Sequence, residues 1–89
     1  MYDIKKYSFD KAKEFGVKIK PSTKGFYKID VFDKDDKYLC SIGDRRYSDY
    51  PTYIETKGQE IADIRRSLYN KRHKKDNGIK GFYAKNLLW

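Results

Sequence analysis

Hydrophobic side chains recur at helical spacing near the start of the chain. Phe9, Ala12 and Phe15 would share one face of a helix, with Ser8 as its N-cap and Gly16 just behind its last turn. We therefore predict a short helix here.

A strand pattern follows, in which apolar and polar positions alternate. The segment 26–32 places every second residue on one apolar face, and a polar turn over 33–37 leads to a returning segment over 38–42. A β-hairpin of two strands is only marginally stable in water. We expect it to pack on the long helix, on a third strand over 17–20, or on a partner.

The longest helical pattern runs over 59–76. Thr56 and Gln59 have the spacing of a capping box, which predicts the start of the helix. At about 100° per residue, the apolar positions form a single stripe that we expect to face the core. The stripe consists of Ile61, Ile64, Leu68 and Tyr69, with Ala62 at its edge.

A short apolar segment over 77–89, the tail, follows the turn signal Asn77-Gly78. Its candidate docking residues are Leu87, Leu88 and Trp89. They would dock on the core of this domain or on another chain.

Together these elements predict an α+β fold, a single small domain in which a β-hairpin packs on one long basic helix. The expected parts of the domain over 1–89 are a short N-terminal helix with an extended segment over 1–23, the β-hairpin over 24–43, a tyrosine-rich turn over 44–58, the long helix over 59–76 and the apolar C-terminal tail over 77–89.

Composition adds a thin core and a basic surface to this picture. Charged and apolar residues each make up 38% of the 89 positions, which by itself favours disorder, but nine Tyr, five Phe and one Trp indicate a folded, aromatic-rich core. The net charge of +8 favours an acidic partner such as nucleic acid or an acidic protein surface. Cys40 is the sole cysteine, and no apolar run is long enough to span a membrane, so we expect no internal disulfide and no membrane contact.

Two arginines fall on the predicted apolar stripe. Arg65 and Arg72 are seven residues apart on the packing face of the long helix. Their stems can pack on the core while their heads reach its rim. They can also form a structural ion pair, for which Asp49 is the candidate partner, with Asp44, Glu55 and the terminal carboxylate as alternatives. A third interpretation directs them at a phosphate or an acidic partner.

The basic run at the end of this helix is the candidate contact surface. Between residues 65 and 75 the chain has six Lys or Arg residues and no acid. A solvated face that offsets the helix dipole is the alternative interpretation. The candidate residues for contact with nucleic acid or another partner are Arg45, Arg46, Arg66, Lys71, His73, Lys74 and Lys75.

The sequence does not indicate a catalytic site or a metal site. His73 is the sole histidine, and Asp33, Asp35 and Asp36 lack the glycine and the bidentate glutamate of a calcium loop, so they indicate a turn. We expect no enzyme activity, no cofactor, no metal and no small-molecule substrate.

Several phrases resemble a small uncharacterised family encoded by tailed bacteriophages, including crAss-like phages, and by some large DNA viruses. The phrases are Gly16 to Ser22, Lys28 to Phe32, Ile42 to Asp44, Tyr47 to Tyr53, Tyr69 with Arg72-His73 and Asp76, and the closing Gly81 to Ala84 with Leu87 to Trp89. The chain departs from some relatives at Pro51, where they carry Thr.

This resemblance implies a viral context and carries over no activity or residue role. We therefore expect a non-enzymatic accessory protein of the virion that docks on capsid or other virion proteins and contacts packaged nucleic acid through its basic helix. The alternative is a nucleic-acid-binding protein acting in the infected cell, and a third hypothesis is an inhibitor of a host factor. The expected locations are the virion and, during assembly, the host cytoplasm.

Overall fold

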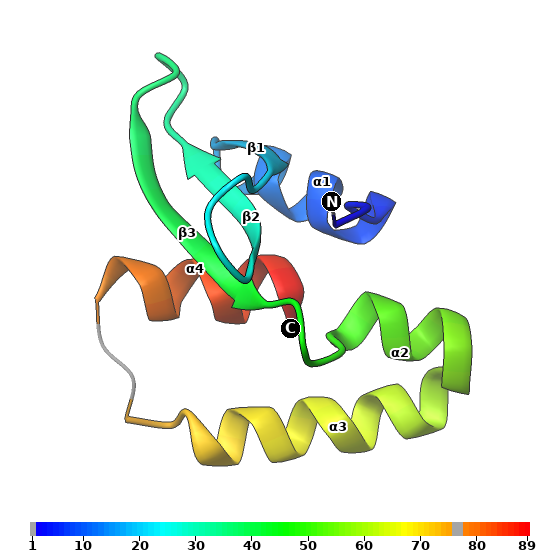
Figure 1. The fold of residues 1–89 in the computed structure, drawn as a ribbon. Coiled ribbons are helices and arrows are strands. Elements are labelled where there is room, and N and C mark those ends of the chain that lie inside the picture. The colour runs from blue at the N-terminus through cyan, green and yellow to red at the C-terminus, as the bar shows by residue number, and fades with distance from the viewer. Residues whose placement is uncertain (1, 76–77) are drawn as a thin grey trace.

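The computed structural model describes residues 2–75 and 78–89, and it confirms the predicted α+β class (Figure 1). In chain order the elements are α1 (Lys6–Glu14), β1 (Lys18–Pro21), β2 (Tyr27–Phe32), β3 (Tyr38–Asp44), α2 (Tyr50–Lys57), α3 (Gln59–Arg72) and α4 (Ile79–Leu88). The long helix ends earlier than predicted. Its predicted last residue, Asp76, and the turn residue Asn77 lie outside the described residues.

The antiparallel sheet has the strand order β1-β2-β3 and provides the centre of the core. Ile29 pairs with Ile42, and Val31 pairs with Cys40, so apolar side chains lie opposite one another across β2 and β3. β1 pairs along the other edge of β2, where Ile19 lies opposite Val31. β1 is therefore the third strand, in the region where a strand over 17–20 was predicted.

Helices α1 and α4 complete this core (Figure 1). Leu87 and Leu88 are 0% and 1% exposed, and Trp89 packs against the same cluster. Ser8, expected as an N-cap, lies inside α1 and donates from Oγ to the Leu87 carbonyl oxygen at 2.7 Å. The tail therefore docks on the core of its own domain rather than on another chain. As a result, Leu87 and Leu88 are not available for contact with a partner.

Gly43 allows α4 to approach β3 closely. Its φ of +78° is a conformation that favours glycine, and a β-carbon there would lie 2.7 Å from Leu88 Cδ1 and 3.0 Å from Lys28 Cδ. A larger residue at this position would strain β3 and displace the leucine that fills the core.

The tyrosine-rich segment forms helix α2 in place of the expected turn. The carboxylate of Asp49 caps α2 by accepting from the Thr52 N–H at 3.0 Å, and Pro51 fits the first helical turn, where an N–H is not needed. Thr56, the expected N-cap of the long helix, lies in α2 and donates to the Thr52 carbonyl oxygen at 2.9 Å. Gly58, at φ +91°, separates α2 from α3.

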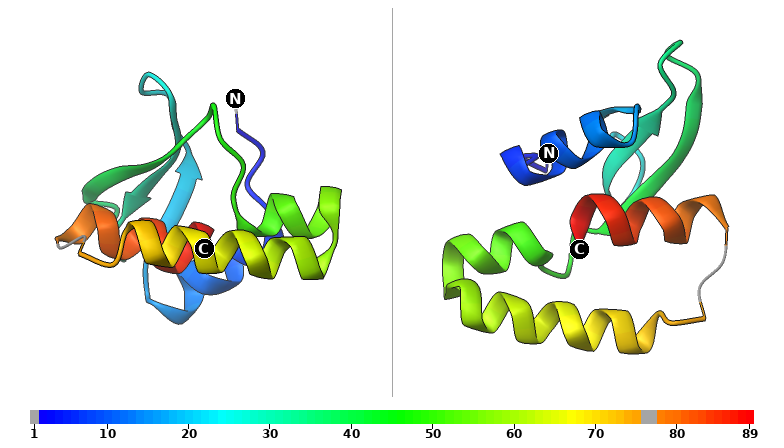
Figure 2. Two further views of the ribbon diagram at one scale, coloured as in Figure 1. Left: turned by 90° about the horizontal axis from the view of Figure 1, so that it is seen from below. Right: turned by 180° about the vertical axis from the view of Figure 1, so that it is seen from behind.

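Helices α2 and α3 form a helical hairpin, and α4 lies between α3 and the sheet (Figures 1 and 2). The buried face of α3 is not the predicted one. Ala62 and Tyr69 are buried, whereas Ile61, Ile64 and Leu68 are 42%, 51% and 46% exposed. The helix is therefore rotated by about a third of a turn from its predicted orientation. The physical reason is that its neighbours offer hydroxyl groups, rings and a main-chain oxygen rather than an aliphatic surface.

Candidate nucleic-acid interface

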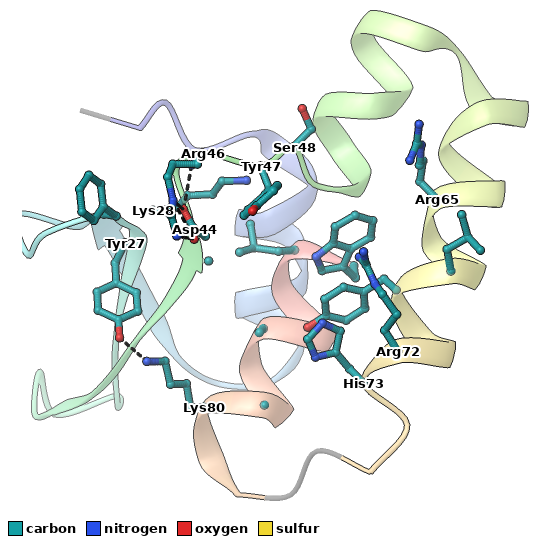
Figure 3. Close-up of a pocket in the computed structure, with 18 of the residues that line it drawn as sticks. Tyr27, Lys28, Asp44, Arg46, Tyr47, Ser48, Arg65, Arg72, His73 and Lys80 are labelled. Atoms are coloured by element: carbon teal, nitrogen blue, oxygen red, sulfur yellow. Dashed lines mark hydrogen bonds and ion pairs between the residues drawn. The ribbon is translucent and has the colours of Figure 1, made fainter.

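An open groove separates the strand end of the sheet from α3, and residues of α4 join its two sides (Figure 3). Its volume is about 1460 Å³. The side chains that define the groove are Phe26, Tyr27, Asp44, Arg46 and Tyr47 on the strand side, Tyr53 from α2, Arg65, Leu68, Tyr69, Arg72, His73 and Lys75 on the α3 side, and Lys80 and Trp89 at either end of α4.

Four cations give the groove its charge. Arg65, Arg72 and Lys75 come from α3 and the segment behind it, and Lys80 comes from the first turn of α4. No carboxylate of residues 2–75 and 78–89 forms an ion pair with any of the four. Among the lining residues that the structure describes, Asp44 has the only acidic side chain. The groove is therefore suited to an anion.

Arg46 adds a cation that is partly neutralised. Its Nη2 lies 2.8 Å from Asp44 Oδ2, and the hydrogen bonds from Arg46 lower the pKa of Asp44 to about 2. Its guanidinium also lies 5.5 Å from the centre of the Phe26 ring and 5.8 Å from that of Tyr47. Arg46 thus has its orientation set by one carboxylate and two rings.

Aromatic rings line both sides of the groove. Trp89 stacks on Tyr69 at 4.5 Å between ring centres, and Tyr69 stacks on His73 at 4.3 Å. On the strand side, Phe26 and Tyr47 are 67% and 69% exposed. Cations that can meet phosphates and exposed rings that can stack on bases are the features that single-stranded nucleic-acid sites combine.

A buried ion pair fastens the helical hairpin beside the groove. Lys28 Nζ donates to Asp49 Oδ2 at 2.7 Å, and the Tyr2 hydroxyl donates to the same oxygen at 2.7 Å. Burial by itself raises the pKa of Asp49, but the charge of Lys28 and hydrogen bonds from Lys28, Thr52 and Tyr2 outweigh it, so the pKa lies below its usual value. Burial and then the contact with Asp49 raise the pKa of Tyr2 well above its usual value.

Asp49 therefore forms a structural ion pair as predicted, but with Lys28 rather than with Arg65 or Arg72. Because α3 is rotated from its predicted orientation, Arg65 and Arg72 are exposed. The guanidinium of Arg65 lies 5.5 Å from the centre of the Tyr53 ring. Figure 3 shows both arginines on the α3 side of the groove, opposite Arg46.

The prediction for Arg66 was also wrong. It was expected to meet a partner, yet it turns inward and lies 3.6 Å from the centre of the Tyr50 ring. Its Nε donates to the main-chain oxygen of Trp89 at 2.8 Å, and its Nη2 donates to the Tyr7 hydroxyl at 2.9 Å. One guanidinium thereby links α3 to α2, to α1 and to the end of α4, because its planar fork can donate in several directions.

The other candidate contact residues divide between the groove and the remaining surface. Arg46, His73 and Lys75 line the groove, whereas Lys71 and Lys74 are exposed but do not line it. Arg45 donates to the carbonyl oxygens of Tyr27 and Ser22, both at 3.1 Å, and so holds the loop before β2.

Lys80 is the groove cation that the sequence did not single out. It donates a short hydrogen bond to the Tyr27 hydroxyl and lies 4.1 Å from the centre of that ring (Figure 3). It is isolated in the sequence of the tail, so no local charge pattern marks it. Only the packing of α4 beside β2 and β3 brings it to the groove.

The described residues contain no group of three or more His, Cys, Asp or Glu side chains arranged to hold a metal ion. Within the same residues, no helix has the length and apolar character needed to cross a membrane. What the fold and the groove define is a small α+β protein with a basic, aromatic-lined groove. Comparison with protein-family models, with curated proteins and with solved structures gave no match for this chain.

Proposed function

We propose that this protein is a non-catalytic binding protein that holds single-stranded nucleic acid in the groove. The observation that carries the proposal is the convergence of Arg65, Arg72, Lys75 and Lys80 with exposed aromatic rings in one open groove. The cations would contact phosphates, which supplies sequence-independent affinity.

The rings favour a single strand over a duplex. In a duplex the bases stack on one another, so their faces are not accessible to protein side chains, whereas an unpaired strand can place bases on Phe26 and Tyr47. Both rings are more than half exposed and lie beside Arg46, which is positioned to contact the adjoining phosphate.

Fluorescence anisotropy with a labelled single-stranded oligonucleotide tests the proposal. We expect binding near 50 mM salt that weakens steeply as the salt concentration rises to about 200 mM. The slope is that of log K, the association constant, against log salt concentration. The double variant Arg65→Ala/Arg72→Ala should reduce the magnitude of this slope by about 2, because each lost phosphate contact reduces it by about 1. Neither arginine forms an ion pair with a described residue, so the fold should persist.

The matched control is Lys13→Ala/Lys34→Ala, which removes the same charge from exposed positions outside the groove. Equal weakening by the two double variants would show that net charge alone drives binding and would reject the groove. A third variant, Tyr47→Ala, should weaken single-strand binding by about 1–3 kcal/mol while leaving the salt slope unchanged. Absence of binding near 50 mM salt rejects the function.

The viral setting is a second proposal, and the sequence resemblance supports it. In that setting the protein is an accessory component of the virion, and the bound strand is packaged nucleic acid or a strand exposed in the infected cell. Leu87 and Leu88 are buried in the core of this domain, so a contact with another virion protein would have to use other residues. Mass spectrometry of purified virus particles decides between the two locations, because absence of the chain from the particles leaves only the infected cell.

A further inference from the structure

A second surface lies on the side of α3 that is turned away from the core. We call Ile61, Ile64 and Leu68 the outer seam, since each is more than two-fifths exposed although all three are aliphatic. They are spaced i, i+3 and i+7, which is the a, d, a spacing of a coiled-coil seam. Leu68 also lines the groove, whereas Ile61 and Ile64 do not. Nucleic-acid binding in the groove therefore leaves the exposure of Ile61 and Ile64 unexplained.

The charges that flank the seam indicate the kind of partner. With Ile61 at position a, Arg65 and Arg72 occupy the two e positions, Lys71 occupies the d position that follows Leu68, and Glu60 at g is the one acid beside the seam among residues 60–72, so three cations outnumber it. Residues at e and g form ion pairs across a coiled coil and so select the partner and its orientation. Because no carboxylate of the described residues pairs with Arg65 or Arg72, both can meet acids of another helix.

We propose that the outer seam binds an acidic amphipathic helix of another protein. The partner helix would place apolar side chains on Ile61, Ile64 and Leu68, and Glu or Asp opposite Arg65, Arg72 and Lys71. Helix α3 has 14 residues, a length of about 21 Å, so it can align with a partner helix over three to four turns.

A second copy of this chain fits the seam less well. In a parallel pair Glu60 at g would meet Arg65 at e of the other copy, but Lys71 would meet Lys71 of the other copy at a core position. In an antiparallel pair the arginines at e would face one another. Two chains of net charge +8 also repel each other. Charge complementarity therefore favours an acidic partner over self-association.

An anionic membrane surface fits less well too. The three seam residues fall within about 60° of the helix circumference, whereas helices that lie in a membrane interface have broad apolar faces rich in Trp, Phe and Leu. A narrow seam is the geometry of helix-on-helix packing.

Selection from a displayed library of random helical peptides of about 16 residues tests the proposal without presupposing the partner. The bait is the full chain, and peptides that bind are then measured by anisotropy against Ile64→Glu. We expect enriched peptides with apolar residues at a and d and an excess of Glu and Asp, and about tenfold or greater weakening by Ile64→Glu. The matched control is Asn70→Glu, which also introduces a glutamate but at an exposed position on the opposite side of α3 from the seam. Its affinity for the peptides should be at most slightly lower than that of the wild type.

Four results would overturn the proposal: no enriched peptide, enriched peptides without acidic bias, equal binding to the wild type and Ile64→Glu, or equal weakening by the control. Dimerisation abolished by Ile64→Glu in sedimentation assigns the seam to a second copy instead, and Ile64-dependent binding to vesicles of anionic phospholipid assigns it to a membrane. Ile64→Glu should keep wild-type oligonucleotide binding apart from a small loss from its added negative charge, which separates this test from that of the groove.

Discussion

The sheet with α1 and α4 and the helical hairpin of α2 and α3 are held by different kinds of interaction. In the first region Ile29, Val31, Ile42, Leu87 and Leu88 are almost completely buried against one another. In the second, the aliphatic residues of α3 face outward, and the contacts inward are rings, hydroxyl groups and a guanidinium.

This difference has a physical consequence for each region. Aliphatic burial is non-directional, and its contribution to the free energy of folding is proportional to the area removed from water. Buried polar groups contribute only while each hydrogen bond is made, and leaving one unpaired is costly. The hairpin is therefore held by a few specific contacts, and the groove between the two regions depends on them.

The largest effect should come from Asp49→Asn. The amide can still cap α2, but Lys28 becomes a buried cation without a counter-charge, and breaking such a pair costs about 3–5 kcal/mol. Chemical denaturation measures the loss in the free energy of unfolding. The double variant Lys28→Met/Asp49→Asn should recover much of it, because no buried charge is then left. A double variant as unstable as Asp49→Asn would show that the hydrogen bonds, and not the charge pair, hold the hairpin.

A matched pair of leucines tests the comparison directly. Leu87→Ala removes fully buried side-chain atoms and should cost about 2–5 kcal/mol. Leu68→Ala, the same substitution at an exposed site on α3, should change the free energy of unfolding by at most about 0.5 kcal/mol. Denaturant titrations of both variants give the two values. Similar losses would mean that α3 packs on apolar surface after all.

The smallest effect should be the acid dependence of the hairpin. The pKa of Asp49 is lower in the folded state than its unfolded value of about 3.9, so its contribution to stability is complete above that pH and is lost as the pH falls through the folded value. Amide hydrogen exchange between about pH 5 and pH 2 should show α2 and α3 losing protection, corrected for intrinsic rates, before β2 and β3. In Lys28→Met/Asp49→Asn this order should depend less on pH. Some dependence should remain, because hydrogen bonds from Tyr50 and Gln59 lower the pKa of Asp63 in the same hairpin. If β2 and β3 open together with the helices in the wild type, the two regions form one cooperative unit.

Prediction from the sequence succeeded where local spacing was sufficient. Alternation over 26–32 and 38–42 marked the two strands, and the helical periodicity from Gln59 marked the start of the long helix. It failed at the tyrosine-rich segment, which was predicted as a turn but forms α2, where Pro51 suits the first turn of the helix. It failed again for the charged residues, since the spacing on α3 shows which residues share a face but not which face turns inward.

The amino-acid sequence by itself determined the α+β class, the periodicity of each element, the net charge of +8 and the grouping of Arg65 and Arg72 with the aliphatic stripe. Only the tertiary structure decided that this stripe faces solvent, that Arg66 turns inward and that Lys80 joins the groove. The physical reason is that hydrophobic periodicity is a property of one helix, whereas its rotation is set by partners far away in the chain. Here those partners are Tyr7, Tyr50 and Trp89, whose ring, hydroxyl and carbonyl groups suit a guanidinium better than a leucine.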